Sequence, residues 1–160
     1  MGNLGQVYLW TLGLLPCGRN SARLVLQDTD VVAPSNLSTS MLTTRAMVGR
    51  KKTRVMAEWA DAREFEMSIV ERDFAANFEI GPREPGVALI GVDNALARQA
   101  IEDVGFGRMI EAGLGRSPQD FLGIDLHTFP ASRAAREVWS QTGLPDPDIT
   151  MPVYRAMLER

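Results

Sequence analysis

The sequence predicts an α/β domain of the Rossmann-like type, with three layers and a mostly parallel sheet. Residues 24–26 and 87–92 are consecutive apolar runs, as in strands that are buried on both faces. Each run is followed by acids: Asp28 and Asp30 after the first, and Asp93 after the second. Open α/β sheets bind ligands outside the carboxyl ends of their parallel strands. We therefore expect these carboxylates to share one ligand-binding edge.

A chain of 160 residues is long enough for a single domain with a hydrophobic core. Its composition, 45% hydrophobic and 23% charged, is typical of a folded soluble protein. The net charge of −3 argues against a broad nucleic-acid surface, so we expect no nucleic-acid partner. The single cysteine, Cys17, excludes an internal disulfide and a cysteine-based zinc site within the chain.

The sequence gives no sign of a membrane span or of secretion. No apolar run approaches the roughly 18 residues that a transmembrane helix needs. The apolar opening, residues 1–18, lacks the basic region of a signal peptide. We therefore expect a cytoplasmic protein that does not bind membranes.

The N-terminal residues predict a glycine turn that leads into a densely apolar, largely buried helix. Gly2 and Gly5 have the spacing that ends a G-x-G-x-x-G loop, in which backbone N–H groups approach a phosphate. Asp28 follows after roughly 20 residues, where dinucleotide folds place the acid that binds a ribose hydroxyl. The alternatives are a flexible N-terminus that holds two glycines, and a capped turn at Asp28 and Asp30.

Two further segments carry polar groups toward the same edge. Residues 42–63 are predicted to be helical, with the main helix starting within residues 49–52. A basic cluster at residues 50–54 includes lysines that can reach a phosphate or can simply face solvent. Asp93 and Asn94 precede a helix, and either of them can cap it instead of binding a ligand. Further strands are expected over residues 66–74, 108–112 and 121–129, and short helices over residues 132–139 and 152–160. The only histidine, His127, lies in an alternating strand and is expected to be structural.

Three stretches resemble motifs of the ThiF/MoeB-type adenylating domain, which ubiquitin-activating enzymes share. DTDVVAPSNL resembles the family's D-x-D-x-V-x-x-S-N-L. VGRKK resembles its D-V-G-x-x-K, and GVDNALAR resembles its D-N-x-x-x-R. The resemblance covers roughly residues 2–130, and three motifs in the family's order carry more weight than any one of them.

The resemblance implies a Rossmann-like homodimer that uses ATP and magnesium to adenylate the C-terminus of a ubiquitin-like or sulfur-carrier protein. The density of apolar residues over positions 7–15 also favours a dimer. In these terms Gly2 and Gly5 flank the phosphates, and Asp28 holds the ribose. The implied cofactor-binding set is Gly2, Gly5, Asp28, Asp30, Asn36, Lys52 and Asp93. The implied catalytic set is Asp93, which holds magnesium, Lys52, which contacts phosphate, and Arg98.

The chain departs from the family pattern at several points. Thr39 stands where the family has an arginine after S-N-L, and Met47 stands where it has an aspartate. The family's first strand, first loop glycine and zinc-binding cysteines are absent, so we expect residues 1–160 to form one partial ThiF-type domain with impaired catalysis. Two other classes stay open: an NAD- or FAD-dependent oxidoreductase, and a non-catalytic nucleotide-binding scaffold. The Asp93–Asn94 pair and the VGRKK segment favour ATP, whereas Thr39 favours the scaffold.

Overall fold

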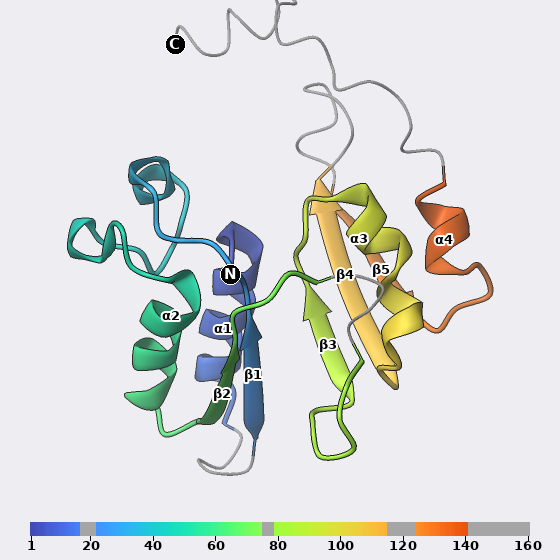
Figure 1. Cartoon of the computed structure of the whole chain (residues 1–160), viewed down its shortest axis with the longest axis horizontal. Coiled ribbons are helices and arrows are strands. Elements are labelled where there is room, and N and C mark those ends of the chain that lie inside the picture. Colours follow the sequence, from blue (N-terminus) through green and yellow to red (C-terminus); the bar gives the residue numbers. More distant parts are fainter. Residues whose placement is uncertain (17–21, 75–78, 115–123, 141–160) are drawn as a thin grey trace, which may run out of the picture.

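The computed structural model describes residues 1–16, 22–74, 79–114 and 124–140 and contains two small sheets with helices packed on them (Figure 1). β1 (Arg23–Gln27) pairs in parallel with β2 (Glu66–Val70). β3 (Val87–Ile90) pairs in parallel with β4 (Arg108–Leu114), and β4 pairs antiparallel with β5 (Ile124–Phe129). The helices are α1 (Asn3–Leu14), α2 (Lys52–Asp61), α3 (Ala95–Gln99) and α4 (Ala135–Val138). Three 3-10 turns complete the set: Pro34–Ser38, Arg45–Met47 and Ile101–Val104.

The connections confirm the predicted α/β class. α2 links the parallel strands β1 and β2, and α3 links the parallel strands β3 and β4, as in βαβ units. Each sheet has its own hydrophobic core. Leu26, Val55 and Met56 anchor the first core, and Ile101 and Phe129 anchor the second. The fold is thus built from two half-sheets that stand side by side (Figure 1).

The expectation that residues 24–26 and 87–92 are strands buried on both faces was wrong. In β1 only Leu26 is fully buried, and in β3 only Ile90. Val87 and Leu89 are 56% and 38% exposed. β1 and β3 also belong to separate sheets, and within the described residues each is paired along one edge only.

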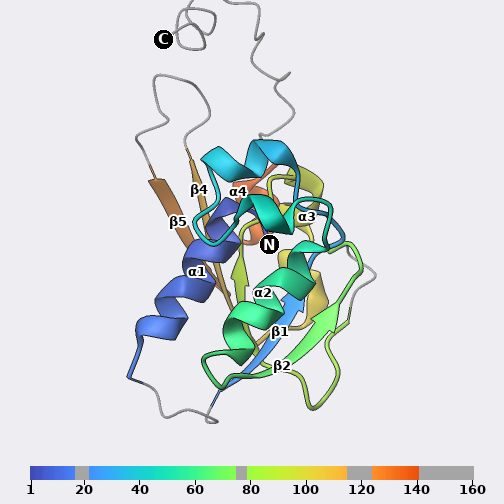
Figure 2. The ribbon, with the colours of Figure 1, turned by 90° about the vertical axis from the view of Figure 1, so that its left-hand side faces the viewer.

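The first helix also differs from its prediction, because it is largely exposed. Gln6 and Leu9 are its only buried residues, whereas Val7, Trp10 and Leu14 are 40%, 37% and 62% exposed. Figure 2 shows α1 lying between α2 and the β4–β5 pair, so that one stripe of the helix faces inward. Its other face is not covered by the part of the chain that the structure describes.

The main helix, α2, starts at Lys52, within the predicted 49–52 start, whereas residues 42–51 are not α-helical as had been expected. Gly49 adopts a φ of +84°, a left-handed conformation that a continuous α-helix does not accept. The backbone N–H of Gly49 instead donates to the carbonyl of Val32 at 2.8 Å, and α2 begins only at Lys52. The N–H of Lys52 donates to the carbonyl of Asp30 at 3.0 Å, so the first turn of α2 starts beside the carboxyl end of β1.

Two further predicted elements are shorter than expected, whereas the strand predicted over residues 108–112 extends to Leu114 as β4. The strand predicted over residues 66–74 ends at Val70, and the helix predicted over 132–139 is a single turn, Ala135–Val138. The strand predicted over 121–129 begins at Ile124 in the described part of the chain. Cys17, the proline-containing segment 141–152 and the predicted helix 152–160 lie outside the described residues. None of the helices that the structure describes is long enough and apolar enough to cross a bilayer.

The contact of Gly13 in α1 with Trp59 in α2 gives a test of this packing. A Cβ at position 13 would lie 2.7 Å from the Trp59 ring. We expect Gly13→Val to lower the free energy of unfolding by about 1–3 kcal/mol, because overpacking forces rigid neighbours apart. Gly86→Ala is the matched control, since an added Cβ there meets nothing within 4 Å. Chemical denaturation of both variants measures the difference, and equal stabilities would contradict the close contact.

Candidate functional site

A cavity of about 960 Å³ lies between the two half-sheets and reaches the carboxyl ends of β1 and β3. Acids from both strand ends line it, as the sequence predicted, because the tips of parallel strands lie at the same edge. The whole predicted cofactor-binding set lines this one cavity: Gly2, Gly5, Asp28, Asp30, Asn36, Lys52 and Asp93. Of the predicted site residues, Arg98 alone is absent from the lining.

The first turn of α1 forms one side of the cavity. Gly2 is the N-cap residue, and its carbonyl accepts the backbone N–H of Gln6 at 3.0 Å. A Cβ at Gly2 would meet nothing within 4 Å, and one at Gly5 would meet only the Met1 side chain, at 3.5 Å. The N–H groups of a first helical turn have no intrahelical acceptors, and the helix dipole makes this end positive. This end of α1 therefore offers donors to an anion in the cavity.

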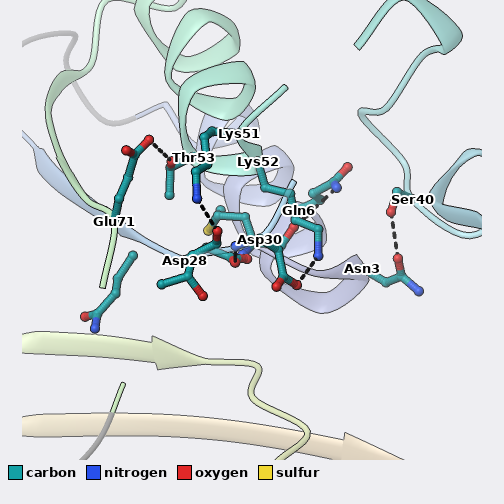
Figure 3. A network of polar contacts seen from close by, with 12 residues as sticks. Asn3, Gln6, Asp28, Asp30, Ser40, Lys51, Lys52, Thr53 and Glu71 are labelled. Carbon is teal, nitrogen blue, oxygen red and sulfur yellow. Dashed lines mark hydrogen bonds and ion pairs between the residues drawn. The ribbon is translucent and has the colours of Figure 1, made fainter. Parts of the chain in front are cut away.

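The carboxyl end of β1 carries a tight polar turn (Figure 3). Oδ1 of Asp28 accepts the backbone N–H of Asp30 at 2.7 Å, and its Oδ2 pairs with the amino group of Met1. The capped turn that was the alternative interpretation of these acids is thus present. It does not remove Asp28 from the cavity, which it still lines.

Lys52 and Asp30 form an ion pair at the same edge (Figure 3). Nζ of Lys52 donates to Oδ2 of Asp30 at 2.6 Å, and the Lys52 side chain is only 11% exposed. The hydrogen bond from Lys52 lowers the pKa of Asp30, against the opposing effect of burial. The basic cluster is therefore not a uniformly solvated helix face, because Lys52 points into the cavity edge while Arg54 pairs with Glu71 outside it.

The loop that follows β1 is fastened to α1 by a buried amide that the sequence analysis missed. Gln6 is 2% exposed. Its Oε1 accepts the backbone N–H of Leu42 at 2.9 Å, and its Nε2 donates to Oγ1 of Thr43 at 3.1 Å. Asn36 shapes the start of the same loop, because its Oδ1 accepts the N–H of Ala33 at 2.8 Å. An amide within an apolar helix was the available signal for this role of Gln6.

Asp93 and Asn94 differ in their contacts. Oδ1 of Asn94 accepts the N–H groups of Leu96 and Ala97 at 2.8 and 3.3 Å, so Asn94 is the N-cap of α3. Asp93 is exposed and lines the cavity. Magnesium in nucleotide sites commonly takes one or two carboxylates and completes its shell with phosphate oxygens and water. The Asp93 carboxylate fits that donor set.

Arg98 of α3 lies in a largely buried cluster with Glu111 of β4 and does not line the cavity. Its Nε donates to the carbonyl of Val92 at 2.8 Å and lies 3.3 Å from Oε1 of Glu111. The guanidinium stacks over the Trp139 ring, with its carbon 4.5 Å from the ring centroid. Glu111 is fully buried, and its Oε2 contacts Nδ1 of His127 at 3.0 Å. His127 thus contacts a buried carboxylate, and Glu111 was not singled out from the sequence.

Comparison with known proteins gives the family. Residues 1–159 match the family described as the BilD C-terminal domain. The chain belongs to this family. A curated relative, the bacterial E1-like protein BilD of Collimonas sp. strain OK412, is 48% identical over an alignment of 160 positions, which covers 98% of this chain and 35% of the relative. The chain therefore spans about a third of that relative's length, 35%.

Solved structures confirm the predicted ThiF/MoeB-type fold. The tRNA N6-threonylcarbamoyladenosine dehydratase TcdA of E. coli superposes with a TM-score of 0.58 at 18% identity, over 72% of this chain and 50% of TcdA. MccB of E. coli, solved with ATP, superposes with a TM-score of 0.54 at 19% identity, over 71% of this chain and 35% of MccB. Both belong to the ThiF/MoeB family of adenylating enzymes. At these identities the likeness concerns the fold.

The position of Arg98 leads to a stability prediction. We expect Arg98→Ala to lower the free energy of unfolding by about 3–5 kcal/mol, because it leaves the buried Glu111 carboxylate without its cationic partner. Arg136→Ala is the control: Arg136 pairs with Asp103 at 3.1 Å but is 71% exposed, so its loss should cost about 0–1 kcal/mol. Denaturant titration of the two variants makes the comparison. Similar small losses in the free energy of unfolding of the two variants would show that Arg98 contributes no more to stability than the exposed Arg136 does.

Proposed function

We propose that this domain binds Mg-ATP in the cavity between β1 and β3 and serves to adenylate the C-terminus of a ubiquitin-like or sulfur-carrier protein. The single observation that carries the proposal is that one cavity gathers the whole cofactor-binding set implied by the ThiF/MoeB resemblance. The neighbours add support, since TcdA was solved with ATP and with AMP, and MccB with ATP. The relative's description as E1-like points to the same class of chemistry.

In the proposed complex, Asp28 accepts hydrogen bonds from the ribose, and the first turn of α1 faces the phosphates. Lys52 contributes a point charge beside them, at the edge where it now meets Asp30. Asp93 would hold magnesium, which would offset phosphate charge. Asn94 keeps α3 capped, so Asp93 remains available for this role. The amide of Asn36 stays in the loop that closes this end of the cavity.

The proposed reaction joins two anions. A carboxylate oxygen of the carrier protein attacks the α-phosphorus of ATP, the bond to the β-phosphate oxygen breaks, and pyrophosphate leaves with the electron pair. No protein side chain acts as nucleophile. The chain must instead position the two reactants and stabilise charge on the phosphoryl oxygens through Lys52 and the backbone donors of α1.

The second candidate is a nucleotide-binding scaffold without turnover, and Thr39 favours it. Thr39 follows the Pro34–Ser38 turn and is exposed, and it brings no charge to the place where the family has an arginine. We propose that binding is retained and that adenylation by these 160 residues is slow. A cytoplasmic homodimer is part of the same proposal, and the exposed face of α1 with Val7, Trp10 and Leu14 supports the dimer.

Substitution of Asp93 tests the nucleotide site. We expect Mg-ATP to raise the melting temperature of the chain, because a ligand that binds only the folded state stabilises it, by about 2.7 kcal/mol at 100 times its Kd. Asp93→Ala should remove the magnesium dependence of this shift and leave the melting temperature without ligand nearly unchanged. Thermal unfolding with ATP, with and without magnesium, provides the measurement.

Asp61→Ala is the matched control, because Asp61 is exposed at the end of α2 and does not line the cavity. This variant should respond to Mg-ATP as the unmodified chain does. NAD is the comparison ligand and should give a smaller shift. A larger shift with NAD would reverse the assignment in favour of the oxidoreductase class.

Exchange of labelled pyrophosphate into ATP, dependent on a candidate ubiquitin-like protein from the same source, tests turnover. We expect weak exchange by the unmodified chain and stronger exchange by Thr39→Arg, because the arginine restores positive charge near the α-phosphate. Thr39→Gln, which adds length without charge, is the control. No exchange by any variant that still binds Mg-ATP would favour the scaffold, and robust exchange by the unmodified chain would refute the impairment.

A further inference from the structure

The backbone that carries Asp93 leaves the β3–β4 ladder before it reaches the cavity. The last paired residues of this ladder are Ile90 and Glu111. Beyond them, the carbonyl of Val92 accepts a hydrogen bond from Nε of Arg98 at 2.8 Å. This carbonyl belongs to the peptide group that joins Val92 to Asp93. The place of the Asp93 carboxylate in the cavity therefore depends on where the Arg98 guanidinium is held.

The Arg98 guanidinium is held by groups from two further elements and from the chain beyond them. Oε1 of Glu111 in β4 lies 3.3 Å from Nε of Arg98, and the Trp139 ring stacks on the guanidinium, with the guanidinium carbon 4.5 Å from the ring centroid. Gly113 of β4 leaves the space that the guanidinium occupies, since a Cβ there would lie 3.0 Å from Nη1 of Arg98. The Arg98 side chain is only 15% exposed, so water competes little for these contacts.

Glu111 supplies the negative charge of this cluster. Among the residues that the structure describes, it is the only charged one that is buried. Its Oε2 contacts Nδ1 of His127 at 3.0 Å, whereas its Oε1 makes no hydrogen bond within the described part of the chain. Oε1 therefore attracts the Arg98 guanidinium by charge, and the Nε–H of Arg98 remains directed at the carbonyl of Val92. The Glu111 carboxylate thus holds the donor that fixes the backbone next to Asp93.

We propose that Glu111 is a positioning residue for Asp93, and that it acts through the Arg98 guanidinium on the Val92 carbonyl. The inference rests on the proposed function, because that function assigns Asp93 to magnesium. Groups that orient a metal ligand without contacting the metal typically change metal affinity by about 10–100-fold when they are altered. Neither Glu111 nor Arg98 lines the cavity, so Arg98 is given a positioning role in place of the catalytic role that the resemblance implied.

Replacement of the whole ion pair separates position from stability. Glu111→Leu combined with Arg98→Met fills the cluster with apolar side chains of similar volume, and such replacements often leave a protein as stable as before. The Val92 carbonyl nevertheless loses its donor. The quantity to measure is the magnesium ratio, which is the dissociation constant of ATP without magnesium divided by that with magnesium. We expect the double variant to keep its melting temperature, whereas its magnesium ratio should fall toward 1, by about tenfold.

Two single variants complete the set. Glu111→Gln keeps the shape of the side chain and removes its charge, so we expect a smaller fall in the magnesium ratio; it also provides the test if the double variant does not fold. Ile101→Val is the matched control, because Ile101 is fully buried in the same hydrophobic core and does not line the cavity. It should lower the melting temperature slightly and leave the magnesium ratio unchanged.

The amide resonance of Asp93 gives a readout without any ligand. Hydrogen bonds polarise the groups that they join, so the resonance of an amide responds to a donor on the carbonyl of the same peptide group. We expect the Asp93 resonance to shift or broaden in Glu111→Gln and in the double variant, and to stay in place in Ile101→Val. A two-dimensional ¹H–¹⁵N spectrum of each ligand-free protein provides the measurement.

The outcomes separate this inference from the proposed function. An unchanged magnesium ratio in both Glu111 variants, in a chain that binds Mg-ATP, would overturn the inference and leave the proposed function standing. An equal fall in Ile101→Val would overturn it as well, because general loosening would then explain the result. So would a fall in the ratio with an unmoved Asp93 resonance, since the Val92 carbonyl would not be the connection. Absence of magnesium-dependent binding in the unmodified chain would overturn the proposed function, and the role of Glu111 with it.

Discussion

The position of α1 is the constraint on which the rest of the structure depends. The two half-sheets share no strand ladder in the described residues, so a helix must connect them. Gly13 allows α1 to contact Trp59 of α2, and Gly91 after β3 allows Leu4 of α1 to approach, where a Cβ would lie 3.2 Å from Cβ of Leu4. Small residues at both contacts let one helix pack against both halves at once. The helix held by these two contacts also contributes to the wall of the cavity between β1 and β3.

The same helix also sets the polar end of the cavity. Gln6 is buried because it faces the loop after β1 rather than solvent, and its amide fixes Leu42 and Thr43. Ser40 adds a second attachment by donating to Oδ1 of Asn3 at 2.7 Å (Figure 3). Since the first turn of α1 and the loop after β1 are bound to each other, the glycines and the Asp28 turn keep one arrangement. A movement of α1 would change both sides of the site together.

The sequence predicted correctly those structural features that depend on a local pattern of residues. Acids after apolar runs located the carboxyl ends of β1 and β3, because strand ends and sheet edges coincide in an α/β fold. Burial was misjudged at Val87 and Val7, because whether an apolar residue is covered depends on which distant segment packs against it. The helical prediction for residues 42–51 was wrong for a different reason: the backbone N–H of the left-handed Gly49 donates to the carbonyl of Val32, a tertiary contact that sequence periodicity does not predict. Similarly, the burial of Glu111 beside Arg98 arises from strand pairing and could not be inferred from either residue alone.

The ion pair between Lys52 and Asp30 has a consequence for any anion that enters the cavity. The ammonium already has a carboxylate partner at 2.6 Å, so an incoming anion exchanges one partner for another rather than meeting a free charge. The net gain is then the difference between two attractions, which favours multiply charged anions over a single carboxylate. A released Asp30 carboxylate would lose its cationic partner, and it could then repel a second anion or accept a hydrogen bond from a neutral part of the ligand. The Lys52–Asp30 ion pair thus weakens the binding of singly charged anions at this edge more than that of multiply charged ones.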